Sequence, residues 1–491
     1  MRRGLPHLGK VPQEVLEKLV ERLRHREPII RGTMTEFRVR VLEELPAADP
    51  AAVLRAVPQG AAPVWLDDAE HGGGFLSWNP DQRVSWQLPV APERAGAGPG
   101  QRWPLAQDPV AQWVEACKGE RWSCDADLPW FGGWLGFLGF ELGHAHLPFP
   151  WTAAEPSGLP HGGFARYPCG LWFGRDATWV LGAEEGAEAW SDEVHEVLKR
   201  AAMLPAARRP ALAFEAQTQA GDFQAQVRRL RHAIGAGELF QANLSHRLSA
   251  DFDGDPREAY CALRPAQPTQ MSAYWEDDLG RAILSWSPER FLSVRGRLAQ
   301  TRPIKGTAPR GASEHEDLAL AQELDASEKE RAELTMIVDM ARNDLGQVAR
   351  PGKVHVLSPG EVESFPTLFH RTATIEAELR DEVDLADVLR ATFPPASVTG
   401  APKVRALQAI AELEQEQRGA YCGALGIWVP GADRADFSVL IRTAVVAERA
   451  MHLRVGAGIV WDSVPQREWE ETWIKARYLE TPCEPTPIRV R

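Results

Sequence analysis

The 491-residue sequence lacks the features that mark several common classes of protein. Its six cysteines are scattered without a Cys-x-x-Cys pair, which excludes zinc-finger spacing and favours free thiols in a reducing compartment. No run of about 18 apolar residues is present, so we expect no membrane span. The N-terminal sequence MRRGLPHLGKVPQEVLEKLV has no apolar core. We therefore expect no signal peptide and a cytoplasmic protein.

Positive charge is also in short supply. The chain has 55 lysines and arginines against 68 acidic residues, which gives a net charge of −13. A general nucleic-acid-binding protein needs a basic face, so we expect no nucleic-acid partner. A small anionic substrate stays open, because a single site can be locally basic. The 44% hydrophobic content supports a substantial core.

The pattern along the chain divides it into three regions. Residues 1–30 are predicted to be an extension with one helix, and residues 31–205 an N-terminal subdomain of strands between Pro, Gly and Ala loops. Residues 215–482 are predicted to be a catalytic region in which helices and alternating strands follow each other. The expected fold class is α+β. In the glycine-rich segment PWFGGWLGFLGFELGHA, close backbone packing is the favoured interpretation.

Two predicted helices each carry a pair of glutamates three residues apart. Residues 327–346 form the first, with Glu330 and Glu333 on one face. The second carries Glu468 and Glu471. If the two helices faced each other, these oxygens could hold a hard cation, and Mg²⁺ fits better than zinc because no His or Cys shares the spacing. The pattern alone is a weak signal, since solvated helix faces also produce it.

The start of the second glutamate helix has its own signal. Ser463 is expected to be the N-cap and to form a capping box with Gln466. Pro465 suits the first turn. Lys475 then lies one turn beyond the glutamates on the same face.

Three other segments offer groups that bind anions. FPPASVTGAPKVRALQAI leads into a helix, whose N-terminal N–H groups would be joined by the hydroxyls of Ser397 and Thr399. LRVGAGIV is expected to leave a strand and expose the amides of Gly456 and Gly458. Alternation in DFSVLIRTAVV places Arg442 on a strand face. Its partner is either a protein carboxylate or a substrate.

Lys305 lies in RPIKGTAPRG, a segment that reads as a turn because it contains two prolines and two glycines. The simplest interpretation is a solvated loop lysine, since lysine is rarely buried without a partner. The alternative is a nucleophile or a clamp for a carboxylate. The segment by itself leaves both open.

Together these segments resemble the chorismate-utilising enzyme family over roughly residues 222–482. The matching stretches, in the family's order, include GELFQANLS, SWSPERFL, RPIKGTAPRG, ELTMIVDMARNDLG, RGAYCGALGIW and RVGAGIVWDSVPQREWEETWIKA. GGWLGFLGFE resembles a motif in the N-terminal part of the anthranilate and aminodeoxychorismate synthase large subunits. The resemblance implies large antiparallel β-sheets flanked by helices, the anthranilate synthase component I type of fold. It leaves open an aromatic amino-acid pocket in the N-terminal subdomain.

The resemblance also implies a Mg²⁺-dependent site for chorismate, which is a dicarboxylate. Glu333 and Glu471 match the metal-binding glutamates, and Glu330 and Glu468 match acidic residues beside the ion. Glu289 matches the acid that protonates the departing C4 hydroxyl. The implied substrate-binding residues are Gly306, Thr307, His370, Ser397, Tyr421, Arg442, Gly456, Gly458 and Lys475.

Lys305 indicates which branch of the family the chain resembles. The anthranilate synthase subunits resemble PIAGT at this point, and the aminodeoxychorismate synthase subunits resemble PIKGT. The resemblance implies that neutral Lys305 attacks C2 of chorismate while Glu289 assists loss of the C4 hydroxyl. Ammonia then adds at C4 and expels the lysine, which gives 4-amino-4-deoxychorismate for 4-aminobenzoate and folate synthesis. Arg302 and Arg310, with partial desolvation, are expected to lower the pKa of Lys305.

The sequence contains no Gly-x-Cys-x-Gly elbow of a glutamine amidotransferase. We therefore expect the ammonia to come from a separate amidotransferase subunit. Two alternatives stay open. The first is an anthranilate synthase large subunit, and Lys305 is the feature that argues against it. The second is a non-catalytic paralogue that binds chorismate or an aromatic amino acid and regulates a partner.

Overall fold

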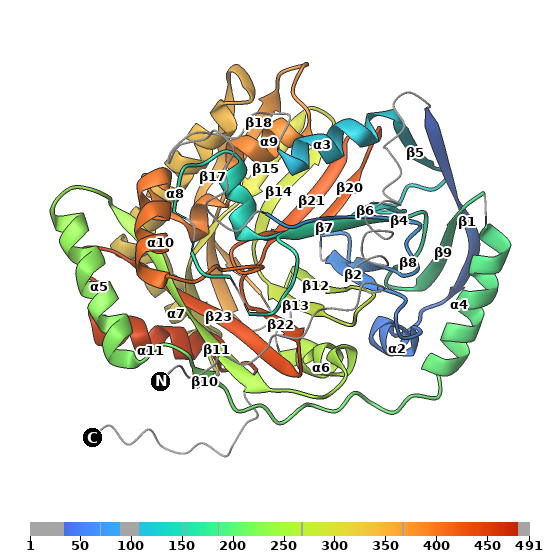
Figure 1. Cartoon of the computed structure of the whole chain (residues 1–491), viewed down its shortest axis with the longest axis horizontal. Coiled ribbons are helices and arrows are strands. Elements are labelled where there is room, and N and C mark those ends of the chain that lie inside the picture. The colour runs from blue at the N-terminus through green and yellow to red at the C-terminus, as the bar shows by residue number, and fades with distance from the viewer. Residues whose placement is uncertain are drawn as a thin grey trace, which may run out of the picture.

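The computed structural model describes residues 34–479, apart from residues 69, 89–107, 151, 155, 185, 267–268 and 366–367. The predicted N-terminal extension, residues 1–30, lies outside the described residues. The described part contains a 13-stranded and a 10-stranded sheet with helices packed around them (Figure 1). This arrangement confirms the α+β class with large antiparallel sheets. No helix among the described residues is long and apolar enough to cross a membrane.

The 13-stranded sheet runs in the order β10-β11-β23-β22-β13-β12-β2-β3-β8-β9-β1-β5, and β19 pairs with β11. Its described pairs are antiparallel apart from β1 and β5, which are parallel. The strands are β1 (Thr35–Pro46), β2 (Val64–Asp68), β3 (Gly73–Ser77), β5 (Glu120–Cys124), β8 (Cys169–Phe173), β9 (Ala177–Ala183), β10 (Glu215–Ala216), β11 (Gln241–Asp251), β12 (Met271–Glu276), β13 (Ala282–Ser287), β19 (Gly400–Ala401), β22 (Thr443–Ala447) and β23 (Ala450–Ile459).

The 10-stranded sheet runs in the order β16-β18-β15-β14-β21-β20-β6-β7-β4, and β17 pairs with β18. Its strands are β4 (Gln82–Trp86), β6 (Gly133–Leu138), β7 (Gly162–Tyr167), β14 (Arg290–Arg295), β15 (Leu298–Arg302), β16 (Ile304–Pro309), β17 (Ala349–Ser364), β18 (Leu368–Leu379), β20 (Ala424–Val429) and β21 (Arg434–Val439). Each sheet combines strands from residues 31–205 with strands from residues 215–482.

Helices cover the outer faces of both sheets. The α-helices are α2 (Pro50–Ala56), α3 (Pro109–Ala116), α4 (Ala187–Ala201), α5 (Ala220–Gly235), α6 (Pro256–Leu263), α7 (Glu314–Ala326), α8 (Glu328–Gly346), α9 (Leu385–Thr392), α10 (Lys403–Glu414) and α11 (Pro465–Ala476). Short 3₁₀ turns are η2 (Cys117–Gly119), η3 (Phe140–Ala145), η4 (Arg264–Ala266) and η5 (Ala396–Val398). In Figure 1, α5, α10 and α11 gather beside β11 and β23.

A hydrophobic layer lies between the two sheets, and a central strand shows how the sequence builds it. Along β6, Leu135 and Phe137 join the layer between the sheets, while Trp134 and Leu138 join the core on the opposite face. A strand buried on both faces has no polar side to present. This explains why the segment reads as a continuous apolar and glycine run.

Apolar faces fix the positions of two helices, α8 of the predicted site and α5. On α8, Leu334, Ile337 and Val338 are buried, and the helix packs on β16, β17 and β18. On α5, Phe223, Val227 and Leu230 are buried against β11, β23 and α10. The apolar periodicity expected from the sequence thus sets which side of each helix faces the protein.

Gly136 provides a test of the close packing expected in the glycine-rich segment. A Cβ at this position would lie 2.0 Å from the carbonyl oxygen of Gly163 on β7. We expect Gly136→Ala to force the strands apart and to lower the free energy of unfolding by about 3 kcal/mol or more. Gly221 on α5 has no atom within 4 Å of its Cβ position, so Gly221→Ala is the control and should be neutral or stabilising. Equal urea midpoints for both variants would contradict the prediction.

Candidate active site

The predicted site residues come together from elements that are far apart in the sequence. Lys305 lies on β16, and Glu289 lies in the short connection between β13 and β14. Ser397 belongs to η5, which packs with β16 against α8. Glu333 projects from α8 and Glu471 from α11. The site therefore depends on both sheets and on two of the helices that cover them.

Lys305 is a half-buried side chain rather than a solvated one. Its Nζ donates a hydrogen bond to the carbonyl oxygen of Ser397 at 3.1 Å. Burial lowers the pKa of Lys305, although the carboxylates of Glu333 and Glu289 oppose this effect. Lys475 adds to the lowering as a neighbouring cation. The amine is thus held in surroundings that favour its neutral form more than water does.

The expectation that Arg302 and Arg310 lower this pKa is wrong. Arg302 is hydrogen-bonded to both carboxylate oxygens of Glu363. Arg310 donates to Asp317 at 2.7 Å, and neither arginine is among the main groups that shift the pKa of Lys305. Their charges are already neutralised by local carboxylates, whereas Lys475 reaches the site from α11.

Glu289 is 4% exposed and lines a small pocket with Ser397, and its charge acts on Lys305. Burial raises its pKa to about 7, while a hydrogen bond with Ser397 and the charge of Lys305 partly offset that effect. The carboxyl group is therefore largely protonated just below neutral pH. A buried carboxyl of this kind can donate a proton.

Four glutamates on α8 and α11 form a group of interacting carboxylates. Burial raises the pKa of Glu333, Lys305 lowers it, and Glu330 and Glu471 raise it further. Burial also raises the pKa of Glu468, and Glu471 adds to this effect. These mutual shifts place the two glutamate pairs within electrostatic reach of each other.

Lysines already compensate part of this negative charge. Lys475 lies 2.7 Å from Glu471, and its attraction holds the pKa of Glu471 low against the opposing effect of burial. Lys329 lies 3.9 Å from Glu333. In the part of the chain that the structure describes, no three His, Cys, Asp or Glu side chains are placed to hold a metal ion.

His370 lies on β18, where it pairs with Thr307 of β16. The Nδ1 atom of His370 lies 2.9 Å from the hydroxyl of Thr307. Burial lowers the pKa of His370 to about 4, and the nearby charge of Arg442 contributes, so the imidazole is neutral at physiological pH. Gly306 has φ +83°, and a Cβ there would lie 3.2 Å from a carboxylate oxygen of Glu330. Glycine is therefore needed where β16 passes α8.

The placement of Arg442 on a strand face is wrong. β21 ends at Val439, and Arg442 lies in the connection to β22 with φ +49°. A left-handed residue breaks the alternation of a strand, so the period-two pattern does not apply to it. Burial lowers the pKa of Arg442, and its charge acts on His370. The residue thus reaches the predicted site from a bend.

The two glycines of LRVGAGIV lie inside β23 instead of leaving it. Gly456 pairs with Ser245 and Gly458 with Asn243 across β11. A Cβ at Gly456 would lie 2.7 Å from the hydroxyl of Tyr421, and Lys475 donates to the Gly456 carbonyl at 2.9 Å. The glycine therefore allows both predicted substrate contacts to approach the strand.

Sequence reasoning missed Gln241, which lies next to Gly458. Its side chain is 2% exposed, and its Nε2 would lie 2.5 Å from a Cβ at Gly458. Its buried Oε1 has no hydrogen-bond partner among the described residues. The residue sits in the matching stretch GELFQANLS, but a single uncharged amide gives no pattern from which a role can be inferred.

The expected capping box of the second glutamate helix is wrong. α11 begins at Pro465 with Val464 as its N-cap residue, and no side chain caps it. The Ser463 hydroxyl instead accepts the N–H of Val460 at 3.1 Å. Because proline lacks an N–H group, the first turn has less need of a cap. Glu468, Glu471 and Lys475 still lie on the helix as predicted.

Comparison with known proteins assigns the family. Residues 62–481 match the family described as chorismate binding enzyme. The chain belongs to this family. A solved relative of this chorismate-binding enzyme, anthranilate synthase component I from Streptococcus pneumoniae, has a TM-score of 0.68 and 27% identity. The alignment covers 97% of this chain and 100% of that structure, which confirms the expected fold.

Two curated relatives of this chorismate-binding enzyme carry different names. Anthranilate synthase component 1 of Streptomyces coelicolor is 39% identical over 374 residues, which is 72% of this chain and 73% of the relative. Aminodeoxychorismate synthase component 1 of Salmonella typhimurium is 37% identical over 368 residues, which is 73% of this chain and 78% of the relative. Because the two identities are so similar, they establish the family but do not indicate which of the two reactions this chain catalyses.

The raised pKa of Glu289 makes stability depend on pH. With a folded-state pKa near 7 against an ordinary value of 4.5, the folded protein binds more protons than the unfolded protein between these values. This stabilisation is complete below about pH 4.5 and is lost as the pH rises through about 7. Relative to Glu289→Gln, the wild-type free energy of unfolding should fall by up to about 3 kcal/mol across this range.

Urea unfolding at a series of pH values measures this difference. Glu323→Gln, at an exposed position on α7, is the control and should follow the wild-type profile. If the free energies of unfolding of wild type and Glu289→Gln changed with pH in parallel, the pKa of Glu289 would not be raised in the folded protein.

Proposed function

We propose that this chorismate-binding enzyme is the large subunit of an aminodeoxychorismate synthase. In this reaction chorismate and ammonia give 4-amino-4-deoxychorismate and water, towards 4-aminobenzoate and folate. The observation that carries the proposal is Lys305, whose amine lies 3.1 Å from the Ser397 carbonyl and is electrostatically coupled to Glu289. An amine held there beside a protonated carboxyl suits covalent catalysis.

The reaction proceeds in two displacements. In the first, the neutral Lys305 amine forms a bond to C2, the ring double bonds shift, and the C4 hydroxyl leaves as water with the proton of Glu289. In the second, ammonia forms a bond to C4 and the bond between C2 and Lys305 breaks. The proton that the incoming ammonia loses returns to the Glu289 carboxylate. Each displacement is easier than direct exchange at C4.

The two carboxylates of chorismate need cationic or hydrogen-bonding partners. Arg442 and Lys475 supply positive charge, and Ser397, Thr307 and Tyr421 supply hydroxyls around the pocket. Neutral His370 donates or accepts a hydrogen bond without adding charge. Gly306 lets β16 pass close to α8, and Gly456 lets the Tyr421 hydroxyl approach β23.

The glutamates of α8 and α11 fit a divalent metal by their chemistry. Carboxylate oxygens are the ligands that Mg²⁺ prefers. Burial raises the pKa of Glu333 and of Glu468, and the carboxylate of Glu471 raises both further, so a cation would relieve negative charge there. Glu333 and Glu471 would hold Mg²⁺, with Glu330 and Glu468 beside it. The bound ion would neutralise a carboxylate of the substrate.

A separate glutamine amidotransferase subunit is proposed as the source of ammonia. The sequence contains no amidotransferase elbow. Both curated relatives are named as component 1 of their enzymes, which supports a second component. We therefore expect the isolated chain to use ammonium salts and not glutamine.

Anthranilate synthase component I is the second candidate function. The Streptomyces coelicolor relative, at 39% identity, favours it. Lys305 opposes it, because direct addition of ammonia at C2 has no use for an amine at that position. A non-catalytic paralogue is opposed by the acid, the amine and the carboxylates, because Glu289, Glu333 and Glu330 all act on the charge of Lys305.

Product analysis of Lys305→Ala tests the proposal. Wild-type protein with chorismate, Mg²⁺ and ammonium should give 4-aminobenzoate only after an aminodeoxychorismate lyase is added, as detected by mass spectrometry. Lys305→Ala should lower this product by a factor of at least about 10³, because the nucleophile is lost. Lys199→Ala, at a 70% exposed position on α4, is the control. Direct release of anthranilate by the wild type would establish the alternative.

Metal dependence can be measured without turnover. Mg²⁺ at about 100 times its Kd should raise the free energy of unfolding by about 2.7 kcal/mol, because it binds the folded state. Glu333→Gln and Glu471→Gln should remove this stabilisation in thermal scans. Glu470→Gln, on the exposed side of α11, should retain it. Retention by all three variants would place the ion elsewhere.

A further inference from the structure

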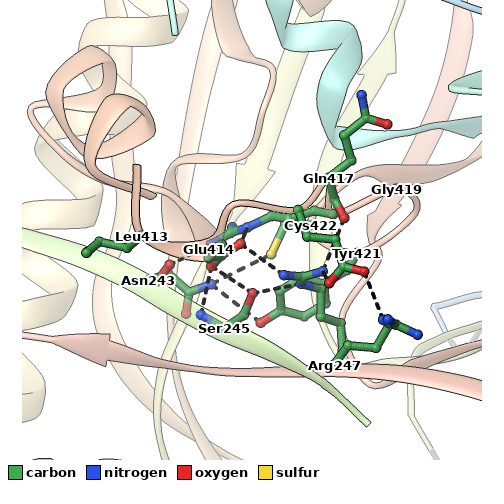
Figure 2. Close-up of polar contacts among 12 residues, drawn as sticks. Asn243, Ser245, Arg247, Leu413, Glu414, Gln417, Gly419, Tyr421 and Cys422 are labelled. Carbon is green, nitrogen blue, oxygen red and sulfur yellow. Dashed lines mark hydrogen bonds and ion pairs between the residues drawn. The ribbon is translucent and has the colours of Figure 1, made fainter. Parts of the chain in front are cut away.

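A buried cluster of charged side chains lies next to the pocket and takes no part in the proposed chemistry. We call it the Arg418 cluster, and it comprises Ser245, Glu414, Arg418 and Arg454, with Glu141 behind them. Figure 2 shows Ser245 and Glu414 of this cluster together with Asn243 and Tyr421. The residues come from η3, β11, the end of α10 and β23. Charges this deeply buried need a full set of partners.

Arg418 and Glu414 form the centre of the cluster. Both side chains are 1% exposed. The guanidinium group donates from Nη2 to one carboxylate oxygen at 2.7 Å and from Nε to the other at 2.9 Å. Attraction to Arg418 and Arg454 holds the pKa of Glu414 low against burial. The pair is therefore bidentate, which fixes the plane of the guanidinium group.

The remaining donors of Arg418 contact both walls of the candidate site. Its Nη1 donates to the carbonyl of Val398 at 3.2 Å, one residue after Ser397. Its Nη2 also donates to the carbonyl of Asn243 at 2.6 Å, and the Asn243 amide lies 3.4 Å from the Tyr421 hydroxyl. The guanidinium carbon lies 5.5 Å from the centre of the Tyr421 ring. One side chain thus connects η5 with the turn that presents Tyr421.

Further hydrogen bonds fix the cluster from behind. Glu141 accepts the backbone N–H groups of Arg418 at 2.7 Å and of Gly419 at 3.1 Å. Ser245 donates its N–H and its hydroxyl to Glu414, each at 2.8 Å. Arg454 donates to the Ser245 hydroxyl at 3.0 Å. The plane and position of the Arg418 guanidinium are therefore set by contacts on several sides.

From these contacts we propose that Arg418 is a positioning residue for chorismate, which fixes Ser397 and Tyr421 at the separation that the bound substrate requires. The proposal rests on the proposed function in taking these two residues as substrate contacts. A lysine at this position keeps the charge, but its single ammonium group cannot satisfy Glu414 bidentately while also reaching Val398 and Asn243. The two walls would then lose their common support.

The chain offers a matched control for the loss of stability. Arg257 is fully buried, and it binds Glu276 bidentately at 2.8 and 2.7 Å. It also donates to the backbone carbonyl of Val57. None of these partners belongs to the candidate site. Arg257→Lys therefore disturbs an equally buried pair without touching the pocket.

The experiment compares Arg418→Lys with Arg257→Lys in the full-length chain. Both variants should lower the melting temperature. Arg418→Lys should in addition raise the KM for chorismate by about tenfold to a hundredfold, because substrate contacts move by a fraction of an ångström. Arg257→Lys should keep the wild-type KM. Chorismate binding with Mg²⁺, followed by tryptophan fluorescence, gives the affinity without depending on the product.

A wild-type KM and affinity in folded Arg418→Lys would overturn the proposal, as would an equal rise in KM for both variants. If Arg418→Lys does not fold, Glu414→Gln serves instead, since its amide keeps one acceptor for Arg418. The proposal then requires that the KM of Glu414→Gln for chorismate be higher than that of Glu276→Gln, which is the matched control. A wild-type enzyme that releases anthranilate would refute the proposed function, whereas the KM comparison would still decide the role of Arg418.

Discussion

The site depends on the burial of one amine between carboxyl groups. Burial favours neutral Lys305 and protonated Glu289, while their mutual attraction favours the charged forms of both. The outcome is two groups whose pKa values lie closer together than those of a free lysine and a free glutamate. Such a balance needs a pocket in which water cannot take over the hydrogen bonds. The rest of the fold holds these groups in place.

The two sheets and their helices hold the site residues in position. β16 brings Lys305 to the end of the 10-stranded sheet, and β23 brings Gly456 from the 13-stranded sheet. α8 and α11 add carboxylates, and the buried faces of these helices fix where the carboxylates lie. The lysines that accompany the glutamates limit the repulsion between them. Substrate binding and stability therefore depend on the same layers of packing.

The sequence predicted the α+β class and the two glutamate helices, because apolar periodicity and family motifs are local signals. Prediction from the sequence failed where contacts between distant residues determine the partner of a side chain or the path of the backbone. The partners of Arg302 and Arg310 are Glu363 and Asp317, and no spacing rule pairs the first of these. The bend at Arg442 and the continuous strand through Gly456 are set by neighbouring strands. Gln241 and the Arg418 cluster can be recognised only once the fold shows that their side chains are buried.

The chain is almost equally identical to an anthranilate synthase component 1 and to an aminodeoxychorismate synthase component 1. Overall identity therefore does not indicate the product, and the proposal depends on Lys305. The scaffold, the carboxylates and the acid suit any reaction that removes the C4 hydroxyl of chorismate. In the function we propose, what distinguishes the products is the group that meets C2 while that bond breaks. An alanine there would leave C2 open to ammonia, whereas Lys305 extends from β16 to the Ser397 carbonyl. Under that proposal nitrogen enters at C4, and a single side chain sets the regiochemistry.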